Sequence, residues 1–535
     1  MFADECYWRD LVAFTWNLRT CEGREQIRAM LRATLAAARP KKFVVEDFQI
    51  PIGDTETWFS FETAVGRGIG HLRLKDGKCW TLLTTLRELK GFEEKRGAAP
   101  AAGDLGIAQQ PYCVIVGGGQ GGIGLAARLK RIGVPAIVIE KNRRAGDSWR
   151  KRYQSLVLHD PVWYDHMPYL PFPEHWPVFS PKDRIGDWLE MYAKVMELDY
   201  WSATECVGAK YDSEKSVWEV KVKRDQTLLT LKPKHLILAT GMSGVPNVPK
   251  IAGAASFQGV QCHSSRHQGG EGWQGKECVV VGSGTSAHDI CADLWEHGAH
   301  VTMIQRAPAI VVRSATLMDL AWGKLYSEAA LEAGITTDLA DLSVASVPFK
   351  VLPELQKPIY EEIAKRDADL YEGLEKAGFQ FDFGADGSGI HSTYLRRGAG
   401  YYIEVGASQM IIEGKVKLAR GSLARINEKS VQLENHVALP ADLIVYATGY
   451  GSMNGWAAQL ISQEVAERVG ICWGLGSGTK NDPGPWEGEL RNMWKPTAQP
   501  GLWFHGGNLM QSRHYSLYLA LQLKARLEGI STPVF

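Results

Sequence analysis

The spacing of apolar residues divides the chain into short apolar runs and longer stretches with helical spacing. Two runs, Cys113–Val116 and Cys278–Val281, have the length and the β-branched content of buried strands. Each run ends at a glycine-rich turn, and helical spacing follows the turn. A strand, a glycine turn and a helix in this order are typical of α/β folds with a parallel sheet. Because the unit occurs twice, we predict two such sheets.

The first 95 residues have a different pattern. The stretch 24–35 has helical spacing, and alternating aromatic and β-branched residues then predict strands within 43–48, 58–63 and 80–83. An Ala-, Gly- and Pro-rich stretch inside 96–110 has the composition of a linker. We therefore predict a small α+β domain over 1–95 that folds apart from the rest of the chain, and a linker over 96–110.

The two α/β units set the remaining domain boundaries. The first unit is predicted over 111–249, and the chain is expected to return to it over 451–535. The second unit is predicted over 250–450, with a helical insertion at about 315–400 that contains the helical stretch 358–364. This insertion is expected to shape a substrate pocket, but it carries no motif that identifies the substrate.

The glycine turns indicate what the two units bind. The first turn is Gly117-Gly118-Gly119-Gln120-Gly121-Gly122, and the second is Gly282-Ser283-Gly284-Thr285-Ser286-Ala287. Such turns bring main-chain N–H groups and a helix N-terminus against a pyrophosphate. A single turn of this kind is also compatible with an ordinary tight connection. Two of them, each followed downstream by Ala-Thr-Gly, predict two dinucleotides that face one another.

The residues that end the next strands assign the two ligands. After the first turn, the predicted strand ends at Glu140, which suits the ribose diol of the adenosine half of FAD. After the second turn, the strand ends at Gln305-Arg306, without a carboxylate. A guanidinium grips a 2′-phosphate where a carboxylate would repel it. We therefore predict FAD at the first site and NADPH at the second, with a surface role for Arg306 and a grip by Arg313 as the alternative.

Composition narrows the class of protein. The 535 residues contain 60 Lys and Arg against 60 Asp and Glu, so the formal net charge of zero favours neither nucleic acid nor an anionic membrane as a partner. No apolar stretch approaches the ~20 residues that span a bilayer, and the N-terminus does not resemble a secretory signal. The nine cysteines include no Cys-x-x-Cys, so structural zinc and disulfides are not expected, and we expect a cytoplasmic protein.

The cysteine pattern also bears on where the electrons go. Disulfide reductases with two dinucleotide folds carry a closely spaced redox-active cysteine pair. Here Cys278 and Cys291 do not qualify, because they are not adjacent and Cys278 lies in a predicted buried strand. Electrons that pass from NADPH to the flavin must leave by another route, and we expect O2 to accept them.

A motif between the two glycine turns carries a family resemblance. Phe257-Gln258-Gly259-Val260-Gln261-Cys262-His263-Ser264-Ser265-Arg266-His267 resembles the FxGxxxHxxx signature of class B flavin-dependent monooxygenases. This family contains the flavin-containing monooxygenases, the plant YUCCA enzymes and the Baeyer–Villiger monooxygenases. The likeness extends over both glycine turns and Ala447-Thr448-Gly449-Tyr450. The residue after the signature is His267, where flavin-containing monooxygenases usually have Tyr or Phe and Baeyer–Villiger enzymes have Trp. The subclass therefore stays open, although lack of the Trp argues against Baeyer–Villiger chemistry.

The resemblance implies a reaction. It implies an NADPH- and FAD-dependent monooxygenase that forms a C4a-hydroperoxyflavin and oxygenates N or S of a small organic substrate, with O2 as the second partner. Baeyer–Villiger oxygenation of a ketone and YUCCA-like decarboxylation of an aromatic 2-oxo acid stay open as alternatives. So does a different class, a non-oxygenating NADPH oxidase or a flavin-binding regulatory protein.

The resemblance also places site residues. His159 aligns with a segment that approaches the flavin C4a edge in flavin-containing enzymes, and Asn508 with one that approaches the ribityl chain or the nicotinamide. His263, although also compatible with a buried linker histidine, is expected to position the two domains. The candidate catalytic residues are therefore His159, His263 and Asn508. The candidate cofactor contacts are Gly117, Gly119, Gly122, Glu140, Lys141, Asp147, Trp149, Arg150, His159, Val207, Thr240, Gly241, Gly282, Ser283, Gly284, Thr285, Ser286, Ala287, Arg306, Thr448, Gly449, Tyr450 and Asn508.

The N-terminal segment resembles SnoaL-like (nuclear-transport-factor-2-like) α+β cones. Such cones usually begin with helices, whereas here strand character already starts at Tyr7-Trp8-Arg9-Asp10, so an incomplete cone or a truncated chain stays open. The resemblance implies a role in packing or in forming a homodimer.

Overall fold

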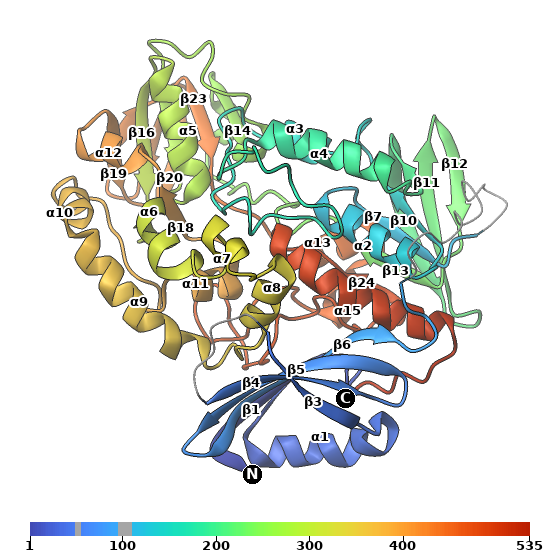
Figure 1. Cartoon of the computed structure of the whole chain (residues 1–535). Helices are drawn as coiled ribbons and strands as arrows, with labels where there is room; N and C mark the ends of the chain where they lie inside the picture. Colours follow the sequence, from blue (N-terminus) through green and yellow to red (C-terminus); the bar gives the residue numbers. More distant parts are fainter. Residues whose placement is uncertain (49–54, 95–109) are drawn as a thin grey trace.

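The fold contains two parallel sheets and a separate N-terminal mixed sheet (Figure 1). The computed structural model describes residues 1–48, 55–94 and 110–535. The predicted linker over 96–110 therefore lies, apart from its last residue, outside the described residues. The prediction of two dinucleotide-binding α/β units is confirmed by both sheets.

The first parallel sheet is formed by short, largely buried strands. Its order is β24-β13-β7-β8-β9, with β24 at Leu502–Phe504, β13 at His235–Leu238, β7 at Cys113–Val116, β8 at Ala136–Ile139 and β9 at Tyr200–Trp201. The late strand β24 pairs with β13, so the chain does return to this sheet after the second unit. Helices α2 (Gln120–Arg131) and α15 (Leu509–Leu527) pack together beside it. Because α15 is buried along nearly its whole length, it forms part of the core rather than the surface.

The second parallel sheet repeats the same plan. Its order is β14-β23-β15-β16-β19, with β14 at Val260–His263, β23 at Leu443–Tyr446, β15 at Glu277–Val281, β16 at His300–Gln305 and β19 at Val416–Arg420. Helices α5 (Thr285–Glu296) and α12 (Ala407–Ile412) pack on it. Pairing of β14 with β23 joins the start of this unit to its end.

Three smaller sheets decorate the two units. A three-stranded antiparallel sheet contains β10 (Thr204–Asp212), β11 (Val217–Arg224) and β12 (Thr227–Leu231). A second contains β20 (Leu423–Asn427), β21 (Ser430–Leu433) and β22 (Ala438–Pro440). Strands β17 (Ile310–Arg313) and β18 (Tyr401–Glu404) pair in parallel and bracket the inserted helices.

The insertion is helical, as its pattern predicts. It comprises α6 (Ser314–Leu317), a π-helix at Met318–Trp322, α7 (Glu328–Glu332), α8 (Thr337–Ala345), α9 (Leu352–Arg366), α10 (Ala368–Lys376) and α11 (Gly389–Arg397). In Figure 1 α8 lies between the N-terminal sheet and the nucleotide-binding units. The insertion is therefore in a position to connect them.

The N-terminal segment forms one six-stranded sheet with a helix beside it. The strand order is β2-β1-β6-β5-β4-β3, and the strands are β1 (Phe2–Leu11), β2 (Leu18–Glu22), β3 (Lys41–Glu46), β4 (Glu56–Glu62), β5 (Gly66–Lys75) and β6 (Lys78–Leu89). The predicted helix is α1 at Gly23–Ala38. The pattern missed β2 and β5, and the resemblance to SnoaL-like cones stays a prediction.

This N-terminal sheet is more tightly joined to the rest than the linker composition suggests. Arg9, which is 1% exposed, forms a bidentate ion pair with the carboxylate of Glu489, at 2.7 and 2.8 Å. The same guanidinium donates to Tyr515 Oη on α15 at 2.9 Å and to the carbonyl of Ala345 at 2.8 Å. A continuous apolar cluster crosses this boundary. The expectation that 1–95 folds apart is therefore not supported by these contacts.

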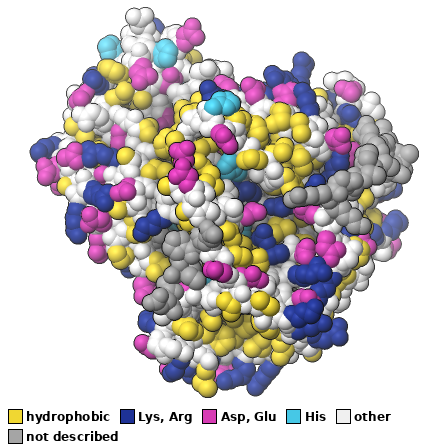
Figure 2. All heavy atoms as spheres, viewed as in Figure 1, with side chains coloured by type: hydrophobic (Ala, Val, Ile, Leu, Met, Phe, Trp, Pro, Cys, Tyr) yellow, Lys and Arg dark blue, Asp and Glu magenta, His cyan; other side chains and the backbone are white. Residues whose placement is uncertain are grey.

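The distribution of charged side chains on the surface agrees with the formal net charge of zero. Figure 2 shows acidic and basic side chains interspersed over most of one face. Among the described residues, no helix is both long and apolar enough to cross a membrane.

Candidate functional site

A single large cavity lies where both parallel sheets, the inserted helices and the N-terminal sheet meet. Its volume is about 1700 Å³, above the ~300–1,000 Å³ usual for one small ligand. Both glycine turns and both Ala-Thr-Gly segments line it. The cavity is therefore large enough to hold more than one molecule.

At two positions of the first glycine turn, the neighbouring backbone leaves room only for glycine. Gly117 has a φ of +110°, and a Cβ there would lie 2.4 Å from the carbonyl oxygen of Ala239. A Cβ on Gly122 would lie 2.0 Å from the carbonyl oxygen of Gly117. Close backbone approach at these two points holds the turn against β13 and lets the N-terminus of α2 face the cavity.

Glu140 follows β8 and fixes the neighbouring loops. Its carboxylate accepts from the main-chain N–H of Gly118 at 2.8 Å, and from the main-chain N–H and side-chain amide of Asn142 at 2.8 and 2.7 Å. The residue is 7% exposed and lines the cavity. A carboxylate held in this way faces the position that a ribose diol takes in dinucleotide folds.

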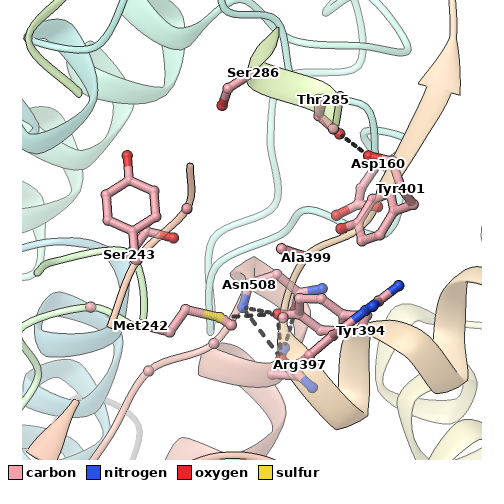
Figure 3. Close-up of a pocket in the computed structure, with 18 of the residues that line it drawn as sticks. Asp160, Met242, Ser243, Thr285, Ser286, Tyr394, Arg397, Ala399, Tyr401 and Asn508 are labelled. Atoms are coloured by element: carbon pink, nitrogen blue, oxygen red, sulfur yellow. Dashed lines mark hydrogen bonds between the residues drawn. The ribbon is translucent and has the colours of Figure 1, made fainter. Parts of the chain in front are cut away.

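The second glycine turn repeats the first. Gly282 has a φ of +133°, and a Cβ there would lie 2.4 Å from the carbonyl oxygen of Ala447. Thr285 begins α5, and its hydroxyl donates to the carbonyl oxygen of Tyr401 at 3.0 Å (Figure 3). Ser283, Gly284 and Ser286 line the same wall. This side of the cavity is therefore a second cradle for a pyrophosphate.

Arg306 lies directly after β16 at the mouth of the second cradle. It is exposed, lines the cavity, and has no ion pair or hydrogen bond to another described residue. Arg313 differs, because its guanidinium is paired with Asp369 at 2.6 Å and lies 3.7 Å from Asp367. Of the two candidates for a 2′-phosphate, only Arg306 has an uncommitted guanidinium.

The two Ala-Thr-Gly segments end β13 and β23 and pass beneath the cavity. Gly241 and Gly449 adopt left-handed backbone conformations, with φ of +83° and +76°. Thr240 Oγ1 is buried and has no hydrogen-bond partner among the described residues. Thr448 Oγ1 donates to the carbonyl of Asn247 at 2.5 Å, and Tyr450 also lines the cavity.

His263 lies behind this wall. Its Nδ1 accepts from the main-chain N–H of Ser265 at 3.1 Å, so its Nε2–H donates to the carbonyl of Gly449 at 3.0 Å. The ring is 4% exposed and packs edge-on against Tyr450. Burial lowers the pKa of His263, so the ring is neutral. These contacts position the glycine of the second Ala-Thr-Gly, which supports a positioning role.

His159 and Asn508 both line the cavity between the cradles. His159 lies edge-on to Tyr401, with the ring centres 5.8 Å apart. Asn508 caps α15: its Oδ1 accepts from the main-chain N–H of Gln511 at 2.9 Å, and its Nδ2 donates to Tyr164 Oη at 3.0 Å. The side chain of Asn508 thus already has two hydrogen-bond partners, and Figure 3 shows it beside Tyr394.

Most other predicted contacts line the cavity, and four do not. Lys141, Trp149 and Val207 are among the lining residues. The four that do not line it are Gly122, Asp147, Arg150 and Ala287. Arg150 is instead engaged in ion pairs with Asp147, Asp187 and Glu190, so its side chain faces α4 (Lys182–Val195) rather than the cavity.

Comparison with known proteins agrees with this geometry. Residues 114–338 match the family model described as pyridine nucleotide-disulphide oxidoreductase. Indole-3-pyruvate monooxygenase YUCCA1 of Oryza sativa subsp. japonica is 28% identical over 364 residues, which cover 67% of this chain and 82% of that protein. Probable indole-3-pyruvate monooxygenase YUCCA7 of Arabidopsis thaliana is 30% identical over 349 residues, covering 63% of this chain and 74% of that protein.

The chain belongs to the class B flavin-dependent monooxygenases. A solved structure with the same fold is the OTEMO complex with FAD and NADP, with a TM-score of 0.55 and 18% identity, covering 79% of this chain and 86% of that chain. This monooxygenase is an oxidoreductase, and its cofactors are FAD and NADPH.

The residues present fit these cofactors. Both turns carry glycines whose Cβ would clash with the backbone, which is the shape that close approach of a pyrophosphate requires. The buried, unpartnered Thr240 Oγ1 gives the flavin side a free hydroxyl. The nine cysteines are all unpaired, and all but Cys262 are buried.

Several residues that line the cavity of the monooxygenase could not be predicted from the sequence. Tyr394 and Arg397 lie on α11, and Met242 follows the first Ala-Thr-Gly; Figure 3 shows all three around the space next to Asn508. Trp58 and His71 reach the cavity from the N-terminal sheet. Only the fold brings these residues together, because no short-range pattern connects them.

Proposed function

We propose that this monooxygenase oxygenates a nitrogen or sulfur atom of a small organic molecule, with NADPH and O2 as co-substrates. When bound, the flavin provides the redox chemistry, namely the oxidation of NADPH and the activation of O2. The chain supplies the two cradles, the walls that exclude water, and the protonation state of the groups around the substrate.

The observation that carries the proposal is a cavity wall of three tyrosines and one buried carboxyl, whose neutral forms are favoured by burial. Burial raises the pKa of the Asp160 carboxyl, although the nearby His159 opposes this shift. Burial likewise raises the pKa values of Tyr164, Tyr394 and Tyr401. All four residues line the cavity beside Asn508. The three tyrosine hydroxyls can donate hydrogen bonds, and burial favours the neutral form of the Asp160 carboxyl, so this wall suits an electrophilic oxidant and a soft nucleophile as its target.

A second candidate has its own support. The relatives described above are named indole-3-pyruvate monooxygenases, and indole-3-pyruvate is a 2-oxo acid. Arg397 lines the cavity, and no ion pair of its guanidinium with another described residue is present. A free guanidinium is suited to a carboxylate. Oxidative decarboxylation of an aromatic 2-oxo acid is therefore the alternative.

Product analysis with a matched pair of substrates separates these reactions. FAD-loaded enzyme with NADPH and O2 receives methyl phenyl sulfide or phenylpyruvate, and the products are identified by mass spectrometry while NADPH and hydrogen peroxide are followed. The proposal expects the sulfoxide and NADPH consumption that the sulfide stimulates. Phenylacetate from phenylpyruvate, with loss of this activity in Arg397→Leu, would support decarboxylation instead. Hydrogen peroxide as the only product would contradict both and support an oxidase.

A further inference from the structure

The cavity does not end at the inserted helices but reaches the N-terminal sheet. Glu56 and Trp58 on β4, and His71 and Arg73 on β5, line the same cavity as the two nucleotide cradles. From the other side, this end is closed by residues after and within α8, including Ser343 and Phe349. Arg73 holds the two sides together, because its guanidinium donates to Ser346 Oγ at 2.7 Å and to the Ser346 carbonyl at 2.9 Å.

Three polar atoms at this end are buried and have no partner. Trp58 and His71 are each 1% exposed, yet Trp58 Nε1 and His71 Nδ1 have no hydrogen-bond partner among the described residues. Ser343 Oγ is also buried and has no hydrogen-bond partner among the described residues. A buried polar group without a partner is costly, typically about 1–3 kcal/mol, so unpartnered groups on a cavity wall point to a ligand that supplies the missing bonds.

The carboxylate of Glu56 determines which ring nitrogen of His71 carries the proton. His71 Nε2 lies 3.2 Å from Glu56 Oε2, and this hydrogen bond is the main reason that the pKa of Glu56 is lowered. The proton of a neutral His71 therefore sits on Nε2, which leaves Nδ1 as an acceptor. Trp58 Nε1–H is a donor, and the two rings pack 4.4 Å apart. The end of the cavity thus offers one donor and one acceptor side by side, plus a hydroxyl that serves as either.

The charges at this end are already neutralised. Arg73 is paired with Glu56 at 2.9 Å, and Arg9 with Glu489 at 2.7 Å. A charged ligand would find no free counter-ion among these groups. The surrounding side chains of Val344, Phe349 and Leu352 are apolar and suit a hydrophobic body.

We propose that the N-terminal sheet forms the far end of the substrate site, where Trp58, His71 and Ser343 bind a neutral, hydrogen-bonding group, such as an amide, on a molecule with an apolar or aromatic body. The proposal rests on the proposed function only in identifying that molecule as the substrate. A row of contacts connects this site to the cofactor side of the cavity. The ring centres of Tyr326 and Tyr164 lie 4.9 Å apart, and Tyr164 Oη accepts a hydrogen bond from Asn508 Nδ2.

Binding of a defined probe tests the site without requiring turnover. Calorimetric titration of the FAD-loaded full-length protein uses 2-naphthamide, whose amide matches the donor and acceptor, and 2-naphthoate as its anionic isostere. The variants are Trp58→Phe, which removes the indole N–H, and Ser343→Ala. The matched control is Trp80→Phe, since Trp80 lies on β6 of the same sheet, also has an unpartnered Nε1, and does not line the cavity.

The expected result is that 2-naphthamide binds and that Trp58→Phe and Ser343→Ala each weaken it about three- to tenfold, the loss of one hydrogen bond. Trp80→Phe should leave the affinity unchanged, and 2-naphthoate should be insensitive to all three variants. Flavin content and melting temperature verify that each variant is folded. Absence of 2-naphthamide binding, or an equal loss in Trp80→Phe, would overturn the proposal. Binding as expected without any NADPH-dependent oxygenation would contradict the proposed function alone.

Discussion

Arg306→Ala should convert this monooxygenase from a strong preference for NADPH to a weak one. Arg306 stands at the end of β16, exposed at the mouth of the second cradle, and no other described residue engages its guanidinium. NADPH differs from NADH only by the 2′-phosphate. The substitution therefore removes an interaction that only one of the two coenzymes makes.

The structure sets the size of the effect. Hydrogen bonds to a charged group contribute ~1.5–3 kcal/mol, and ~1.4 kcal/mol corresponds to one decade in affinity. The expected loss of affinity for NADPH is therefore roughly ten- to a hundredfold. Because Arg306 is exposed, salt and water screen the pair, and we expect a loss near the lower limit, about tenfold. The loss should shrink further as the salt concentration rises.

Anaerobic reduction of the bound flavin measures the coenzyme preference directly, and it needs no organic substrate. The bleaching of the flavin absorbance is followed in a stopped-flow instrument against the concentrations of NADPH and NADH. Arg306→Ala should raise the apparent Kd for NADPH and leave that for NADH unchanged. Arg313→Ala is the matched control, since Asp369 already occupies its guanidinium. An unchanged coenzyme preference in Arg306→Ala, or an equal loss in Arg313→Ala, would refute the assignment.

Three further predictions follow from single contacts. Gly117→Ala should purify without FAD, because its Cβ would lie 2.4 Å from the Ala239 carbonyl oxygen; a normal flavin-to-protein absorbance ratio would contradict this. Arg9→Met should lower the free energy of unfolding by about 3–5 kcal/mol, because Glu489 is left buried and unpaired, and adding Glu489→Leu should restore much of the melting temperature; an unaffected single variant would show that the pair is dispensable. Burial raises the pKa of Asp289 to about 7, so its folded-state proton stabilises the protein fully below about pH 4 and this contribution is lost as the pH rises to about 7. The melting temperature of Asp289→Asn relative to the original protein should therefore increase over this range, and a difference independent of pH would argue against the shift.

The sequence predicted those parts of the fold that depend on short-range patterns. The strands β7 and β15 and the helices that follow them were expected, because β-branched runs and clashing glycines are local features. The cradles and Glu140 followed from the same spacing. The joined N-terminal sheet was not expected, because the Arg9–Glu489 contact links residues 480 positions apart, and a linker composition says nothing about packing.

The less successful site predictions have a similar cause. Arg150 was expected to contact a cofactor, but acidic residues on α4 bind its guanidinium instead. Ser343 and Arg397 lie in the insertion, which has helical spacing and no motif. Which face of such helices meets the cavity depends on tertiary contacts, such as those of α8 with α15 and of α11 with α9.

Oxygen transfer to a nucleophilic substrate is the central claim, and isotopic labelling tests it most directly. FAD-loaded enzyme, NADPH and methyl phenyl sulfide are incubated under isotopically labelled O2, and the sulfoxide is analysed by mass spectrometry. The proposed function predicts a sulfoxide that carries one labelled oxygen atom, in amounts that match the NADPH consumed in the presence of the sulfide. Unlabelled product, or NADPH consumption that yields only hydrogen peroxide, would contradict it.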